Sequence, residues 1–138
     1  MPELPGFVSE VEETCGQEIG ASAEVPLAWQ ALMEHVAENM EAHAAWVGAD
    51  SPAARQEQDG LRRVADAYRA MAAAARTAAQ AMQAMTDVPP APHDPARRDG
   101  AGWVRWMHEK IEMQRELAAM LERHAAASER ALAEPQSR

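Results

Sequence analysis

The strongest constraint on the fold is a run of apolar residues spaced alternately three and four positions apart. The run consists of Leu61, Val64, Tyr68, Met71, Ala75, Ala78, Met82 and Met85. Because an α-helix turns once every 3.6 residues, this spacing lines one helical face and does not fit the two-residue period of a strand. Ser51 offers an N-cap, and Pro52 fits a first helical position that needs no N–H. The sequence therefore predicts a helix over 52–86, with Gly60 as its weakest point.

Two further segments repeat this periodicity. The first begins at Pro26, ends before Gly48 and has the apolar positions Trp29, Met33, Val36, Met40, His43 and Val47. It predicts a helix over 26–47. The second predicts a helix over 101–134, and one of its two apolar rows consists of Val104, Met107, Ile111, Ala118, Leu121, Ala125 and Leu132. The other row consists of Trp103, Trp106, Met113, Leu117, Met120 and His124. Two rows imply two packing neighbours.

The remaining segments lack sustained periodicity. Residues 1–25 form an acidic N-terminal segment in which Ser9 and Glu12 have the spacing of a capping box, so we expect a short helix near 9–19. Residues 87–100 contain four of the nine prolines and are predicted to be a linker. Residues 135–138 are predicted to form a disordered tail.

These elements predict an all-α fold, an antiparallel bundle of three main helices plus a short N-terminal helix. At about 1.5 Å per residue, the helices over 52–86 and 101–134 each approach 50 Å, whereas the helix over 26–47 reaches only about 33 Å. The short helix therefore leaves part of the long pair uncovered. Either the N-terminal segment or a second subunit fills the gap, and we favour completion by a homodimer.

Charge and composition exclude several classes of protein. Residues 1–50 contain ten acidic residues and no Lys or Arg, and the net charge of −9 disfavours nucleic acid and anionic membranes as partners. No apolar window approaches the 18 or so residues of a membrane span. The acidic N-terminus lacks the basic residues of a targeting peptide, so we expect a cytoplasmic protein. The 32 Ala, with twelve Arg against one Lys, are typical of a bacterial genome rich in GC.

No catalytic constellation emerges from the sequence, and we predict neither an enzyme nor a cofactor. Cys15 is the one cysteine, so it has no partner for an internal disulfide or a thiolate cluster. Glu12, Glu13 and Glu18 surround it in the sequence and are expected to raise the pKa of its thiol, which makes a poor nucleophile.

Histidines and carboxylates raise the hypothesis of a metal site. The Glu-x-x-His pairs of di-iron bundles do not occur. His108 and Glu112 lie one turn apart, and His43 and His124 each fall on an apolar row, where suitably aligned helices would bring them together. A ferritin-like or His/Met metal-binding bundle is therefore an alternative. A buried histidine bonded to a carbonyl is the commoner arrangement.

Arginines recur every seven residues along the helix over 52–86, at Arg55, Arg62, Arg69 and Arg76. Such a row lies beside the apolar seam, where it can face the acidic helix over 26–47. The favoured interpretation is a set of flanking charge pairs that fix helix orientation. An anion or acidic-peptide groove is the alternative.

The tripeptide Trp46-Val47-Gly48 lies between two predicted helices. It resembles the Trp-x-Gly turn of the small helical-hairpin substrates of type VII secretion. The resemblance covers residues 26–86 and implies a helical hairpin that is exported without a signal peptide.

Tryptophan and methionine gather on the predicted seams of a chain that is otherwise poor in aromatic residues. Large residues of this kind anchor interfaces. The candidate interface residues are Trp29, Trp103, Trp106, Met107, Met113 and Met120. The sequence therefore favours a non-enzymatic helical protein that binds a protein partner, itself or another chain, through Trp- and Met-rich seams.

Overall fold

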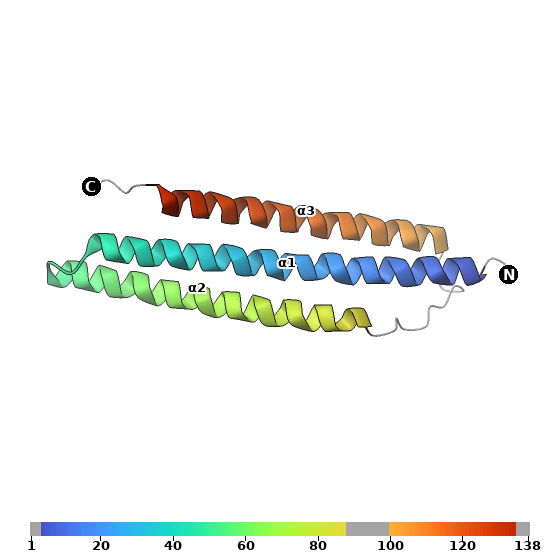
Figure 1. Ribbon diagram of the computed structural model, residues 1–138, viewed down its shortest axis with the longest axis horizontal. Helices are drawn as coiled ribbons and strands as arrows, with labels where there is room; N and C mark the ends of the chain where they lie inside the picture. The colour runs from blue at the N-terminus through green and yellow to red at the C-terminus, as the bar shows by residue number, and fades with distance from the viewer. Residues whose placement is uncertain (1–3, 88–99, 135–138) are drawn as a thin grey trace.

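A computed structural model describes residues 4–87 and 100–134 of the chain, and these residues are helical almost throughout (Figure 1). Helix α1 spans Leu4–Val47, α2 spans Pro52–Ala84, and α3 spans Gly100–Ala133. A short 3₁₀ turn, η1, follows α2 at Met85–Asp87. The described residues contain no strand, so the prediction of an all-α fold is confirmed.

The three helices form an open layer and not a closed bundle. Helix α1 lies in the middle and packs against α2 on one side and against α3 on the other, whereas α2 and α3 make no comparable contact with each other (Figure 1). Helix α2 runs antiparallel to α1, as predicted for a hairpin. Helix α3 runs parallel to α1 (Figure 1). One layer of helices therefore leaves α1 uncovered on two opposite faces.

Helix α1 corrects the predicted boundary at residue 26. A separate short helix near 9–19 does not exist, because one helix of 44 residues runs through Gly16, Gly20 and Pro26. Proline has no N–H for the carbonyl of Ser22 and normally kinks or breaks a helix. Here Ala21, Ala23 and Ala28 are all at most 3% exposed, which shows that tight packing surrounds the proline. Packing on both sides of α1 outweighs the local cost.

Two further predicted segments fall largely outside the described residues. The linker predicted over 87–100 includes residues 88–99, which are not described, while Asp87 belongs to η1 and Gly100 to α3. The predicted tail, 135–138, also lies outside the described residues.

The turn between α1 and α2 follows the sequence signals. The N–H of Gly48 donates to the carbonyl of Ala44 at 3.2 Å, and Gly48 has a φ of 74°, which only glycine adopts without strain. Ser51 then caps α2, since its hydroxyl accepts from the N–H of Ala54 at 3.1 Å. The predicted start at Pro52 is confirmed.

At the contact with α1, the fully buried positions of α2 are all alanine. The buried residues of α2 are Ala65, Ala72 and Ala79, spaced seven apart. The predicted seam is therefore wrong at every second position, because Val64, Met71 and Met85 are 43%, 52% and 55% exposed. Small side chains let two helices approach closely. The row of alanines therefore lies in the contact, and the larger residues of the neighbouring row lie outside it.

The contact between α1 and α3 uses larger side chains. The buried residues of α3 are Val104, Met107, Ile111, Ala118, Leu121 and Ala125. They belong to the first row predicted for this helix, which is confirmed. Ala28 of α1 packs with Ala118 and Leu121 in the buried cluster at its centre. Four members of the second predicted row of α3, Trp106, Met113, Leu117 and Met120, are exposed instead of buried.

Candidate interaction surface

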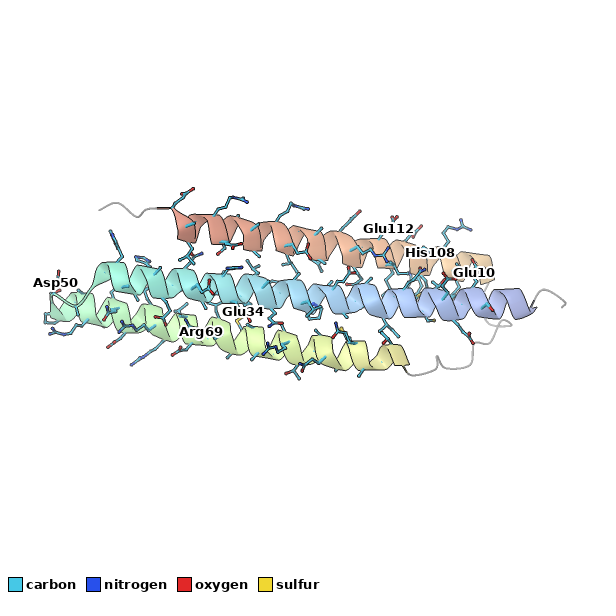
Figure 2. All side chains as sticks on the ribbon, viewed as in Figure 1. Glu10, Glu34, Asp50, Arg69, His108 and Glu112 are labelled. Atoms are coloured by element: carbon cyan, nitrogen blue, oxygen red, sulfur yellow. The ribbon has the colours of Figure 1, made fainter. Side chains whose placement is uncertain are left out.

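One face of the layer is polar, and charged side chains on it pair with each other within the chain. The guanidinium of Arg69 on α2 donates to Glu41 of α1 at 3.1 Å and to Asp66 at 3.2 Å, and Arg62 lies 4.0 Å from Glu41. The hydrogen bond to Glu41 is the main cause that raises the pKa of Arg69. Figure 2 shows Glu34 of α1 close to Arg69 of α2 on this side. The arginine row therefore faces the acidic helix, as the favoured interpretation predicted.

A shallow groove lies on the same polar face. Its volume is about 320 Å³, and it is lined by Gln30, Glu34, Glu38, Arg69, Ala72, Ala73 and Arg76. Acidic and basic side chains line it together, so it has no strong preference for either sign of ligand. The interpretation as an anion groove gains no support from this mixed lining.

The ion pairs define which residues occupy the opposite face of α1 and α2. In an antiparallel pair of helices, the two rows that flank the seam on one side meet each other, and so do the two rows on the other side. Glu41 and Arg69 occupy one side. The other side of α1 carries Cys15, Ser22, Trp29, Val36 and His43. The other side of α2 carries Glu57, Val64, Met71, Ala78 and Met85, followed outward by Gly60, Ala67, Ala74 and Ala81.

Helix α3 adds two rows to this second face. Lys110 lies 3.2 Å from Glu18, and the Asn39 amide donates to the carbonyl of Ser128 at 3.2 Å, so α3 is in parallel register with α1. In this register one flank of the α3 seam meets the α1 row of Trp29. That flank carries Trp103, Lys110, Leu117 and His124, followed outward by Trp106, Met113 and Met120. We call the rows of the three helices on this side the apolar face.

The apolar face exposes eight large apolar side chains, each between 37% and 68% accessible. They are Trp29, Val64, Met71, Met85, Trp106, Met113, Leu117 and Met120. With about 200 Å² for a fully exposed large side chain, they present roughly 800 Å² of surface. The largest apolar patch of an ordinary soluble monomer covers about 300–600 Å². The eight residues together therefore expose more surface than the largest apolar patch of an ordinary soluble monomer.

Charge is nearly absent from these rows. The ionised side chains among them are Lys110 and Glu57, which is exposed near the start of α2. Lys110 is paired with Glu18 and lies 5.6 Å from the centre of the Trp106 ring. The ammonium group of Lys110 therefore lies near both the Trp106 ring and the Glu18 carboxylate, at the edge of the face.

The predicted interface residues divide into two groups. Trp29, Trp106, Met113 and Met120 are exposed on the apolar face, and Trp103 lies half-buried at its end. Met107 differs, because it is 7% exposed and belongs to the contact between α1 and α3.

Sequence reasoning missed the contribution of α2 to the apolar face, since it placed Val64, Met71 and Met85 in the core. The signal was present as a row of alanines seven apart, Ala65, Ala72 and Ala79, directly beside the row of larger residues. A seam of alanine permits closer helix approach than a seam of methionine.

The candidate metal ligands are not brought together. His43 packs against Trp46 with ring centroids 5.7 Å apart. The Asn39–Ser128 contact sets His124 level with the region of residue 35, roughly two turns or about 12 Å along the axis from His43. His108 and Glu112 lie on α3 alone (Figure 2). Among the described residues no three His, Cys, Asp or Glu side chains form a group able to hold a metal ion.

His35 lies on α1, on the side that faces α3. Its Nδ1 is buried and 3.4 Å from Glu38 Oε2, but the contact does not have the geometry of a hydrogen bond. The pair is therefore a contact without a hydrogen bond within one turn of helix.

Cys15 is partly buried in the α1 row of the apolar face. Burial, followed by the charge of Glu18, raises the pKa of its thiol above the ordinary value. The direction agrees with the sequence prediction, although burial and not the acidic neighbours is the larger cause.

The Trp46-Val47-Gly48 tripeptide ends α1 at the hairpin turn. The positive φ and the hydrogen bond of Gly48 show that the glycine terminates the helix. Helix termination therefore accounts for the glycine of this motif.

Comparison of the chain with known protein families, curated proteins and solved structures finds no match. None of the described helices is long and apolar enough to cross a membrane. The chemistry of the surface itself is therefore the basis for a functional proposal.

Proposed function

We propose that the chain is a non-enzymatic, cytoplasmic interaction protein that binds a protein partner through the apolar face. The observation that carries this proposal is the set of eight large apolar side chains exposed together on one side of the layer. Exposed patches of this size mark binding surfaces, and Trp and Met are enriched in the parts of interfaces that carry most of the binding energy.

The chemistry of the face favours a protein over other macromolecules. Nucleic acid and anionic membranes need a basic surface, but the chain has a net charge of −9 and the face presents Lys110 alone, already paired with Glu18. The rows of apolar side chains on three adjacent helices suit another helical surface, because ridges of side chains pack into the grooves between them.

The architecture argues against catalysis. Enzymes exclude water from reacting groups by enclosing them. Over the described residues, the single layer of helices does not enclose a substrate, and the groove beside Arg69 and Glu34 is open and shallow. The face is therefore better suited to recognition than to chemistry.

The proposal is tested by sedimentation of a fluorescently labelled full chain in cell extract. We expect the native sequence to sediment in a complex, and we expect Met113→Glu combined with Met120→Glu to lower the complexed fraction at least tenfold. The two new carboxylates would have to be buried without partners if the complex formed.

A matched control carries the same change of charge on the other surfaces. Gln56→Glu combined with Gln80→Glu adds two carboxylates at exposed positions of α2 outside the apolar face. It should leave the complexed fraction unchanged. A native chain that sediments as a monomer in extract, or equal losses in both double variants, would contradict the proposal.

A further inference from the structure

We infer that the partner is a second copy of this chain, stacked face to face so that α2 of each copy lies over α3 of the other. This inference rests on the proposed function and adds the identity and orientation of the partner. Four features of the apolar face support it: its area, its charge, the sizes of its side chains and the level at which they lie.

The area fits a symmetric dimer. A standard stable interface buries about 800 Å² on each partner. The eight exposed residues of the apolar face present roughly this amount in total. A self-complementary contact uses the same patch twice, so no second surface is required.

The charge distribution permits self-association of an acidic chain. A net charge of −9 opposes the contact of two copies unless the acidic side chains lie away from it. Glu34, Glu38 and Glu41 are on the polar face, close to the arginine row. On the rows that would meet, Lys110 is neutralised by Glu18, and Glu57 is exposed near the start of α2, seven residues before Val64.

The sizes of the side chains select one orientation. The outward row of α3 is large, with Trp106, Met113 and Met120, whereas that of α2 is small and consists of Gly60, Ala67, Ala74 and Ala81. Large side chains pack well into the spaces above small ones. Stacking α3 on α2 pairs large with small. Stacking α3 on α3 would oppose large with large and leave voids between the two α2 helices.

The register supports the same orientation. The Lys110–Glu18 and Asn39–Ser128 contacts set Met120 level with the region of Trp29. The Arg69–Glu41 contact and the bond from the Gln58 side chain to the Ala44 carbonyl at 3.0 Å set Ala74 and Ala81 of α2 around that level. A two-fold axis parallel to the helices does not change the position of a residue along the helix axis. Met120 of one copy then lies between Ala74 and Ala81 of the other.

This symmetry has a distinctive consequence for α1. The two-fold axis runs along the α1 row of the apolar face, so the two α1 helices lie parallel and each residue of that row meets its own counterpart. A two-fold axis across the helices would instead make α1 antiparallel to its counterpart. In that case only one position along the row can meet itself.

The first measurement is the mass of the purified chain by light scattering over a range of concentrations. We expect twice the monomer mass of 15.0 kDa, and we expect monomer for Met113→Glu combined with Met120→Glu. A purified chain that stays monomeric while the chain in extract is complexed would overturn the second copy as partner and leave the proposed function intact.

The second measurement is disulfide formation in single-cysteine variants. In a Cys15→Ala background we place cysteine at Ser22→Cys or at Val36→Cys, about 21 Å apart along α1. We expect both variants to form covalent dimers under mild oxidation, because counterparts across the axis lie within reach of a disulfide. Glu24→Cys, on the polar side of α1, is the matched control and should stay uncrosslinked.

Each alternative outcome is informative. Self-crosslinking at no more than one of the two positions, or mixed crosslinks between the two variants in place of both self-crosslinks, would overturn the parallel orientation in favour of the crossed one. Crosslinking of the Glu24→Cys control as fast as the others would show random collision and overturn the inference. Circular dichroism of each variant verifies that the helices are retained.

Discussion

The two faces of the layer differ in whether contacts within one chain satisfy their side chains. On the polar face Arg69 is satisfied within one chain by Glu41 and Asp66. On the apolar face Met71 and Met85 are left more than half exposed, while the alanines beside them are buried. Burial of a methionine contributes about 1.5–3 kcal/mol, so leaving several outside is costly for a solitary chain. This difference indicates that contacts within one chain satisfy the side chains of the polar face but leave large side chains of the apolar face exposed.

The largest expected effect comes from the tryptophans at the end of the apolar face. We expect Trp103→Ala combined with Trp106→Ala to weaken association by a factor of ten to a thousand, since interface tryptophans often contribute 2 kcal/mol or more each. Most helicity should remain. Light scattering and circular dichroism on the same samples check this, and parallel loss of helicity and association would assign the tryptophans to the core.

The next effect tests which row of α2 is buried. Ala72 is 3% exposed in the close contact with α1, so Ala72→Leu should lower the free energy of unfolding by about 1–3 kcal/mol through overpacking. Ala70→Leu, at an exposed position on the same helix, should change it by less than about 0.5 kcal/mol. Denaturation by urea measures both. Equal effects would mean that the alanine row is not the seam.

A smaller effect is expected on the polar face. Reversal of Arg62 and Arg69 to Glu places like charges beside Glu41. The midpoint of denaturation should fall in low salt and recover largely in high salt, because both arginines are exposed and salt screens the repulsion. A loss that does not depend on salt would mean that these arginines stabilise the layer by packing.

The smallest effect concerns the thiol of Cys15. Because burial and Glu18 raise its pKa, less thiolate is present at a given pH, and alkylation should be slower than for an ordinary thiol until the pH is more alkaline. Glu18→Gln removes the lesser cause and should move the pH–rate profile slightly to lower pH. Timed reaction with iodoacetamide measures the profile, and no shift of the profile would assign the raised pKa to burial alone.

The sequence predicted the elements better than their arrangement. Ser51, Pro52 and Gly48 act locally through caps and dihedral angles, and the turn that they predicted is present. The continuation of α1 through Pro26 was missed, because packing from both sides decides it.

The candidate surface was predicted in part for a similar reason. Met113 and Met120 were identified because the apolar stripe of α3 is too wide for one neighbour. The contribution of Met71 and Met85 depends on which of two adjacent apolar rows meets α1. Periodicity alone cannot decide this, since both rows have the same spacing.

The unequal lengths of the helices have a consequence for how the molecule opens. The contacts of Gln58 with Ala44 and of Arg69 with Glu41 bring the end of α2 level with about residue 20 of α1, so before that point α3 is the main neighbour of α1. Amide hydrogens there should exchange with deuterium fastest within α1, since fewer contacts must break for local unfolding. Protection from exchange should rise along α1 towards Ala28. The N-terminal part of α1 is thus expected to unfold locally, whereas the other end of the helix is expected to unfold only when the whole molecule unfolds.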